Sequence, residues 1–188
     1  MSQAHVLVLV GSLRIDSVNK QIAHTAAALV PEGAEAVVYE GLADVPFYNE
    51  DLDVEGKVPA AALGLRAAAE GATAFLLVTP EYNGTIPAVL KNAIDWLSRP
   101  YGVGAVQGKP VAVISASPSG NGAKWAHDDT RKSVGIAGGK VLEDVVLTIG
   151  GTMDKFGSSH PRENAEVSAQ ISAVVAELVK ASHELVDA

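Results

Sequence analysis

The stretch VLVLVGSLRIDSVNK, residues 6–20, runs five apolar residues directly into Gly11 and then into a polar segment. Consecutive apolar residues are typical of a strand that is covered on both faces, as in a parallel sheet between two layers of helices. Gly11 permits a tight turn, and the helix predicted to follow has unpaired backbone N–H groups and a partial positive charge at its N-terminus. The stretch therefore predicts a buried strand, a turn and a helix.

Four polar side chains on this turn are suited to an anion: Ser12, Arg14, Ser17 and Asn19. Hydroxyl and amide groups can donate to phosphate oxygens, and a guanidinium can neutralise them with a fork of donors. Taken alone, the stretch is equally compatible with an ordinary helix start, in which Ser17 is the N-cap and Arg14 is solvated. It matches neither GxGxxG nor GxxxxGK[ST], so it supports neither a dinucleotide-type Rossmann site nor a P-loop.

The same alternation of apolar runs and helical segments continues along the chain. Strands are predicted at 5–10, 34–40, 73–79, 109–117 and 140–149. Apolar spacing or composition predicts helices over 17–30, 59–70, 87–98, 121–137 and 162–186. Five strands alternating with five helices predict a doubly wound α/β fold with right-handed crossovers, in a single domain over residues 1–188.

Composition limits the classes of function. The 188 residues carry 14 Lys and Arg against 22 Asp and Glu, and a net charge of −8 disfavours nucleic acid or an anionic membrane as a partner. The absence of Cys excludes disulfides and thiolate chemistry, and the five His residues show no ligand spacing, so no metal site is predicted. No apolar run is long enough to span a bilayer, and the start of the chain lacks the basic region of a signal peptide. We therefore expect a cytoplasmic protein.

Two further loops are predicted at the carboxyl edge of the sheet, where such folds bind their ligands. TPEYNGTIP, residues 79–87, offers the flat ring of Tyr82, and its Asn83-Gly84 pair favours a turn whose backbone N–H groups can face a ligand. SASPSGNG, residues 115–122, consists of small residues that let a planar ring approach the backbone. Each loop alone is also compatible with a plain turn or a flexible polar loop.

Two other connections are notable for their length or position. The 41–58 segment is the longest irregular piece of the chain, and loops of that length are often functional. Residues 151–159 form another predicted loop at the carboxyl edge, without an assigned role.

GSLRIDSVNK together with PEYNGTIPAVLKNAIDW resembles the NADPH-dependent FMN reductases, a flavodoxin-like group that includes quinone, chromate and azo-dye reductases. The resemblance extends from residue 5 to about residue 150. It implies a flavodoxin-like parallel sheet of order 2-1-3-4-5 with helices on both faces. It also implies bound FMN, NAD(P)H as co-substrate, and a homodimer or homotetramer in which the helix from Pro87 to Ser98 is an interface surface.

The resemblance also assigns residues to the cofactor. It implies that the FMN phosphate is cradled by Ser12, Arg14, Ser17 and Asn19. It implies that the isoalloxazine ring lies along Pro80, Glu81, Tyr82, Asn83 and Gly84. The other edge of the ring is then closed by Ser115, Ser117 and the backbone from Pro118 to Gly120. Where the family commonly has Gly-Gly-Ala-Arg, this chain has NGAKWAHDDTRK. Its Trp125 could line the substrate opening or an interface, but we expect a partly buried helix residue.

In such an enzyme the flavin carries the chemistry, so no catalytic side chain is predicted. The implied reaction is ping-pong: NAD(P)H gives a hydride to the flavin and leaves, and a quinone, chromate, azo compound or free flavin then takes two electrons. Two other interpretations stay open. One is an FMN-binding electron carrier without NAD(P)H turnover of its own, and the other is a flavin-free regulatory or interaction module.

Overall fold

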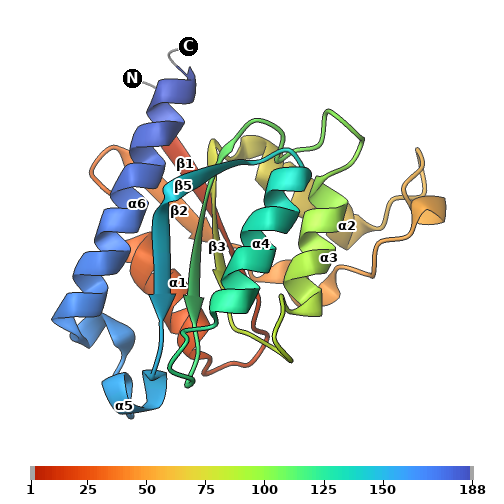
Figure 1. Ribbon diagram of the computed structural model, residues 1–188. Helices are drawn as coiled ribbons and strands as arrows, with labels where there is room; N and C mark the ends of the chain where they lie inside the picture. Colours follow the sequence, from red (N-terminus) through yellow and green to blue (C-terminus); the bar gives the residue numbers. More distant parts are fainter. Residues whose placement is uncertain (1–2, 187–188) are drawn as a thin grey trace.

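The computed structural model describes residues 3–186, and a parallel five-stranded sheet forms its centre (Figure 1). The strand order is β2-β1-β3-β4-β5, which confirms the predicted order 2-1-3-4-5. The strands are β1 (Ala4–Val10), β2 (Ala34–Val38), β3 (Ala74–Thr79), β4 (Pro110–Ala116) and β5 (Lys140–Ile149). Every predicted strand is present, and its ends lie within two residues of the prediction.

The helices are α1 (Val18–Ala28), α2 (Ala60–Gly71), α3 (Ala88–Leu97), α4 (Lys124–Ile136), α5 (Thr152–Phe156) and α6 (Ala165–Val186). Helix α4 begins later than predicted because Gly122 and Ala123 have φ angles of 64° and 61°, which a right-handed helix cannot contain. Helix α5 falls in the 151–159 segment that was predicted to be a loop. Within residues 3–186, no helix combines the length and the apolar character that crossing a membrane requires.

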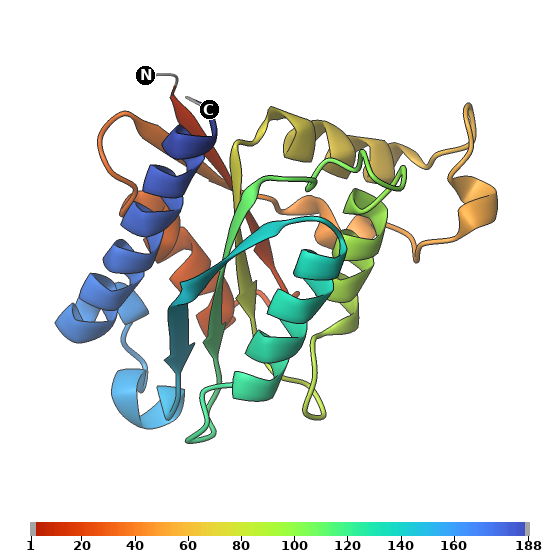
Figure 2. The same ribbon diagram turned by 45° about the horizontal axis from the view of Figure 1, so that its top comes forward.

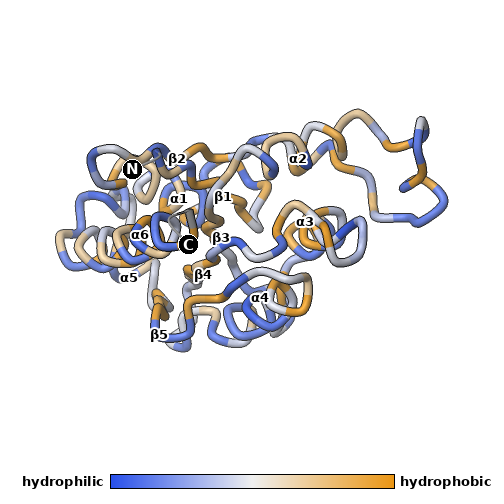
Figure 3. Tube along the Cα trace, turned by 90° about the horizontal axis from the view of Figure 1, so that it is seen from above, coloured by the Kyte–Doolittle hydropathy of each residue, from blue (hydrophilic) through white to orange (hydrophobic). Residues whose placement is uncertain are grey.

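Strand β1 shows why the sheet is buried on both faces. Its residues Val6, Val8 and Val10 pack into a core with α1 and α6, whereas Leu7 and Leu9 pack into a second core with α2 and α3. Seen from above, the strands lie between α1 and α6 on one side and α2, α3 and α4 on the other (Figure 3). Burial of a side chain of this size stabilises the fold by about 1.5–3 kcal/mol. Both faces of β1 gain this stabilisation, which explains why its apolar run is unbroken.

The connection between β2 and α2 extends away from the sheet (Figure 1, Figure 2) but is anchored at its far end. It contains two 3-10 turns, η1 (Gly41–Asp44) and η2 (Glu50–Leu52). Asp53 then accepts two hydrogen bonds from Arg66 of α2, at 2.7 and 2.8 Å, and these side chains are only 11% and 13% exposed. The Arg66 guanidinium also lies 5.2 Å from the ring centre of Trp96 and donates to its carbonyl oxygen. The predicted irregular loop therefore has a fixed conformation.

We expect Asp53→Ala to lower the free energy of unfolding by about 3 kcal/mol, because it leaves a buried guanidinium unpaired. The hydrogen bond from Arg66 holds the pKa of Asp53 below its ordinary value. The pair therefore stabilises the protein above the unfolded-state pKa, and this stabilisation is lost as the pH falls through the folded-state pKa. Urea unfolding at neutral and acidic pH tests this, and the variant should lose less stability than the wild type on acidification.

Asp95→Ala is the matched control, because Asp95 pairs with Lys91 on the exposed surface of α3. It should cost less than about 1 kcal/mol. Equal effects of the two substitutions would contradict the role given to the Asp53–Arg66 pair.

Candidate functional site

The loops that follow β1, β3 and β4 emerge together at the carboxyl edge of the sheet, at the bottom of Figure 1. The register aligns the strand ends, since Val10 is opposite Val78, and Thr79 is opposite Ser115. This edge therefore brings together the three predicted groups of site residues.

The β1 loop is rich in unused donors. Within residues 3–186, no backbone N–H group from Ser12 to Asp16 donates a hydrogen bond. Ser12 and Ser17 are each only 3% exposed, and their hydroxyls have no hydrogen-bond partner among the described residues. Ser17 occupies the N-cap position of the eleven-residue helix α1, but its side chain does not cap the helix. Arg14 is exposed. Free donors gathered at a helix N-terminus are the usual geometry of an anion site, which favours that interpretation over an ordinary capped helix.

Of the predicted phosphate residues, Asn19 already makes a side-chain hydrogen bond within the protein. Its side-chain Nδ2 donates to the backbone oxygen of Ala116 at 3.1 Å and so ties α1 to the end of β4. Its Oδ1 is buried and has no hydrogen-bond partner among the described residues. A buried acceptor of this kind requires a donor, which the hydroxyl group of a ligand supplies and an ionised phosphate oxygen does not.

The β3 loop contains the two-residue turn that Asn83-Gly84 predicts. Asn83 and Gly84 have φ angles of 52° and 78°, and Tyr82 and Thr85 form an isolated antiparallel bridge around them, with N–O distances of 3.2 and 3.3 Å. The backbone N–H groups of Asn83 and Gly84 donate to no other described residue. Both N–H groups are therefore free to bind a ligand.

Three contacts fix this turn to α4. The backbone N–H of Ala126 donates to Glu81 Oε2 at 3.1 Å, and the Thr85 hydroxyl donates to a carboxylate of α4. The Trp125 indole lies against Gly84, where an added Cβ would be 3.4 Å from the ring. Trp125 is 62% exposed, so the expectation of a partly buried helix residue is wrong. The first turn of α4 places this ring over the loop and outside the core.

The β4 loop is organised mainly by its own hydrogen bonds. The fully buried hydroxyl of Ser115 donates to the carbonyl oxygen of Gly122 at 2.7 Å, and this hydrogen bond stabilises the conformation of the loop. The hydroxyls of Ser117 and Ser119 lie 2.6 Å apart at the surface. Gly120 is exposed, with open space around it. Of the predicted residues in this loop, Ser117 and Gly120 are accessible to a ligand and the Ser115 hydroxyl is already engaged.

Gly150, at the end of β5, was not singled out in the sequence. A Cβ at this position would lie 2.6 Å from the carbonyl oxygen of Gly120 and 3.0 Å from that of Ser119. The β4 loop can therefore close on β5 only because residue 150 has no side chain. The Gly-Gly pair directly after a strand was the available signal.

A cavity of about 580 Å³ borders the site on the side of β2. Its walls are formed by Gly11, Leu13, Arg14, the 42–47 segment, Tyr82, Pro87, Ala88, Val89 and Asn92. It shares Arg14 and Tyr82 with the predicted residues and includes none from the β4 loop. The sequence marks the connection that contains residues 42–47 as long and irregular, but it assigns this connection no specific role.

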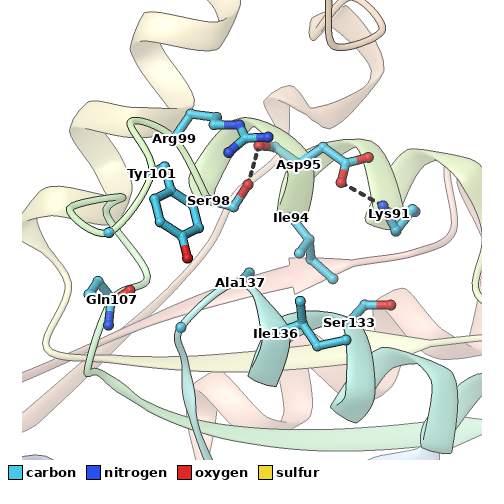
Figure 4. A pocket seen from close by; sticks show the side chains of 12 residues that line it. Lys91, Ile94, Asp95, Ser98, Arg99, Tyr101, Gln107, Ser133, Ile136 and Ala137 are labelled. Atoms are coloured by element: carbon cyan, nitrogen blue, oxygen red, sulfur yellow. Dashed lines mark hydrogen bonds and ion pairs between the residues drawn. The ribbon is translucent and has the colours of Figure 1, made fainter.

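A second cavity, of about 570 Å³, lies between the C-terminal parts of α3 and α4 (Figure 4). Lys91, Asp95, Arg99, Tyr101 and Ile136 are among its lining residues. None of the predicted site residues lines it, and the Lys91 ammonium is paired with Asp95. It is therefore separate from the carboxyl edge.

Fold and site together define a doubly wound α/β protein with free hydrogen-bond donors at the N-terminus of α1 and two further loops at the same edge of its sheet. The chain belongs to the NADPH-dependent FMN reductase family, whose model matches residues 4–154. It is 39% identical to a quinone reductase of Pseudomonas putida over 160 residues, which is 85% of each chain. It is 32% identical to the flavoenzyme NAD(P)H:(acceptor) oxidoreductase of Paracoccus denitrificans, with a TM-score of 0.80 over 94% of this chain and 97% of that one.

The fold is also that of the flavodoxins. A flavodoxin variant from Pseudomonas aeruginosa superposes with a TM-score of 0.57 at 22% identity, covering 91% of this chain and 98% of the other. The predicted flavodoxin-like architecture and the predicted family are both confirmed.

Gly150→Ala should lower the free energy of unfolding by about 1–3 kcal/mol, because the new methyl group must displace the backbone of the β4 loop. The control is Gly71→Ala, at the end of α2, where an added Cβ would meet no atom within 4 Å outside its chain neighbours and its own helix backbone, and where the backbone is not left-handed. Denaturant unfolding of both variants measures the difference. A Gly150 variant as stable as the Gly71 variant would show that the two loops have room to separate.

Proposed function

We propose that the protein is an FMN-dependent NAD(P)H oxidoreductase that reduces a quinone or a similar two-electron acceptor. The observation that carries the proposal is the set of free N–H groups from Ser12 to Asp16 at the N-terminus of α1, beside Arg14, in a chain of the FMN reductase family. The names of its relatives support the acceptor and the co-substrate, since one is a quinone reductase and another an NAD(P)H:(acceptor) oxidoreductase.

The residues present fit a phosphate-bearing flavin. The free N–H groups of the β1 loop, the hydroxyls of Ser12 and Ser17 and the Arg14 guanidinium would hold the phosphate. Because the protein carries a net charge of −8, only such local donors can hold a dianion. The unpartnered Oδ1 of Asn19 suits a hydroxyl group of the ribityl chain. Asn19 would thus bind the ribityl chain of the cofactor and not its phosphate.

The ring would lie between the other two loops. The N–H groups of Asn83, Gly84, Ser119 and Gly120 donate to no other described residue, so they can donate to the polar edge of a flavin and stabilise negative charge there. When bound, FMN would supply the redox chemistry, through which a quinone would gain the hydride of NAD(P)H and, with one proton from solvent, become a hydroquinone. The side chains of this chain bind and orient, and none is needed as an acid or base for the hydride transfer.

We propose that residues 1–188 form a single domain and that the protein works in the cytoplasm, which the absence of Cys permits. We also propose a homodimer or homotetramer. Exposed apolar side chains at or just beyond the C-terminal ends of α3 and α4, including Tyr101 and Ile136, support an interface between copies of the chain.

An absorbance spectrum of the purified protein, followed by anaerobic NADPH and then a quinone, tests the function. A yellow protein that bleaches with NADPH and recovers its colour with quinone is the expected result. A yellow protein that does not bleach would instead be an electron carrier. A colourless protein whose spectrum does not shift on FMN titration would be a flavin-free module.

Arg14→Ala should weaken FMN binding by roughly thirtyfold, because a charge-assisted hydrogen bond contributes about 2 kcal/mol. Arg99→Ala is the control, since Arg99 lines the second cavity, away from the carboxyl edge. Fluorescence titration of the apoproteins with FMN measures both dissociation constants. If Arg14→Ala binds FMN as tightly as the wild type, the phosphate lies elsewhere.

A further inference from the structure

We propose that the 580 Å³ cavity beside the β1 and β3 loops binds the planar apolar ring of the electron acceptor, and that Phe47 selects for that ring. This inference rests on the proposed function, and it adds to it a place and a chemical class for the acceptor.

The cavity adjoins the residues assigned to FMN without coinciding with them. It shares Arg14 and Tyr82 with that site, and no residue of α1 or of the β4 loop lines it. A ligand in the cavity would therefore touch the flavin site from the side of β2. Both reactants of an electron transfer need this kind of adjacency, because hydride transfer requires contact.

The part of the cavity wall around Phe47 is held by hydrogen bonds from α3. Trp96 Nε1 donates to the carbonyl oxygen of Pro46 at 2.8 Å, and Asn92 Nδ2 donates to the same oxygen at 3.0 Å. Asn92 Oδ1 in turn accepts from the backbone N–H of Tyr48 at 2.8 Å. The residues on both sides of Phe47 are thus fixed by hydrogen bonds from buried side chains.

Phe47 itself is 77% exposed. Its phenyl ring lines the cavity, on a backbone that these hydrogen bonds hold in place. An aromatic side chain on a fixed backbone has only two torsions to restrict when it contacts a ligand, and a stacked or edge-on aromatic pair gains about 0.5–1.5 kcal/mol beyond the area that it buries. This combination is what a preorganised contact for a planar ring requires.

The chemistry of the walls favours a neutral ring over an inorganic anion. Leu13, Leu42 and Val45 contribute apolar surface, and the charged lining residues are one base and one acid, Arg14 and Asp44. In the proposed complex the guanidinium of Arg14 is engaged by the phosphate. An oxyanion would exchange water for apolar walls, which is unfavourable, whereas a quinone or other aromatic ring gains from the same exchange.

Phe47→Ala tests the inference in the FMN-loaded protein, with 1,4-naphthoquinone and ferricyanide as acceptors. The KM for naphthoquinone should rise about tenfold, the equivalent of about 1.4 kcal/mol, because the ring contact is lost. The kcat/KM for ferricyanide, a hydrophilic ion, should not change, and neither should the dissociation constant of FMN. Phe47→Leu should recover part of the naphthoquinone KM, since it keeps an apolar wall.

Leu63→Ala is the matched control, because Leu63 is an exposed apolar residue of α2 that lines neither cavity. It should leave the KM for naphthoquinone unchanged. Calorimetric titration of the oxidised holoprotein with naphthoquinone gives a second measure that needs no turnover, and Phe47→Ala should weaken this binding by the same factor.

Several outcomes would overturn the inference. An unchanged naphthoquinone KM means that the ring binds elsewhere, and an equal loss with ferricyanide means that Phe47 supports the site in general. A higher dissociation constant for FMN in the Phe47→Ala variant would make Phe47 a cofactor contact. A changed mass of this variant in solution would make Phe47 an interface residue. A wild-type protein that does not turn over would refute the proposed function instead, while the calorimetric comparison would still decide the role of Phe47.

Discussion

Burial of the central strands on both faces determines where everything else in this structure lies. Every residue of β3 and β4 is buried, so the side chains of these strands are occupied by the two cores and carry no chemistry at the surface. Polar and conformationally special residues can appear only where the strands end. Since the strands are parallel and in register, those ends coincide, and three short loops that are distant in sequence share one edge.

The loops at that edge are shaped mainly by hydrogen bonds to backbone atoms. Asn19 binds a carbonyl of β4, Ser115 binds a carbonyl of the β4 loop, and Glu81 binds an N–H of α4. Each of these side chains resembles a ligand-binding residue in the sequence, yet a large part of its hydrogen-bonding capacity is used to hold a neighbouring loop. The groups left for a ligand are largely backbone N–H groups, which suits a cofactor whose own atoms carry out the chemistry.

The sequence predicts the elements and turns that depend on a local pattern of residues. It does not reveal the contacts that depend on residues far away in the chain. The strand at β1 follows from an unbroken apolar run, and the turn at Asn83-Gly84 follows from the tolerance of those residues for left-handed φ angles. Helix α5 is too short to show a helical period, so its sequence predicts a loop. The use of Asn19 depends on a carbonyl 97 positions away in the sequence, and no local pattern reveals it.

The same distinction explains why the 42–47 segment had no predicted role. Its composition indicates an irregular loop, and its rigidity comes from Asn92 and Trp96, which lie 44 to 50 residues further along the chain. An exposed phenylalanine in a flexible loop would have no definite position relative to the flavin site. Hydrogen bonds from α3 give the backbone at Phe47 a definite position, and α3 also begins at the β3 loop on which the flavin ring is proposed to lie. The helix thus positions both walls of the gap in which the acceptor would meet the cofactor.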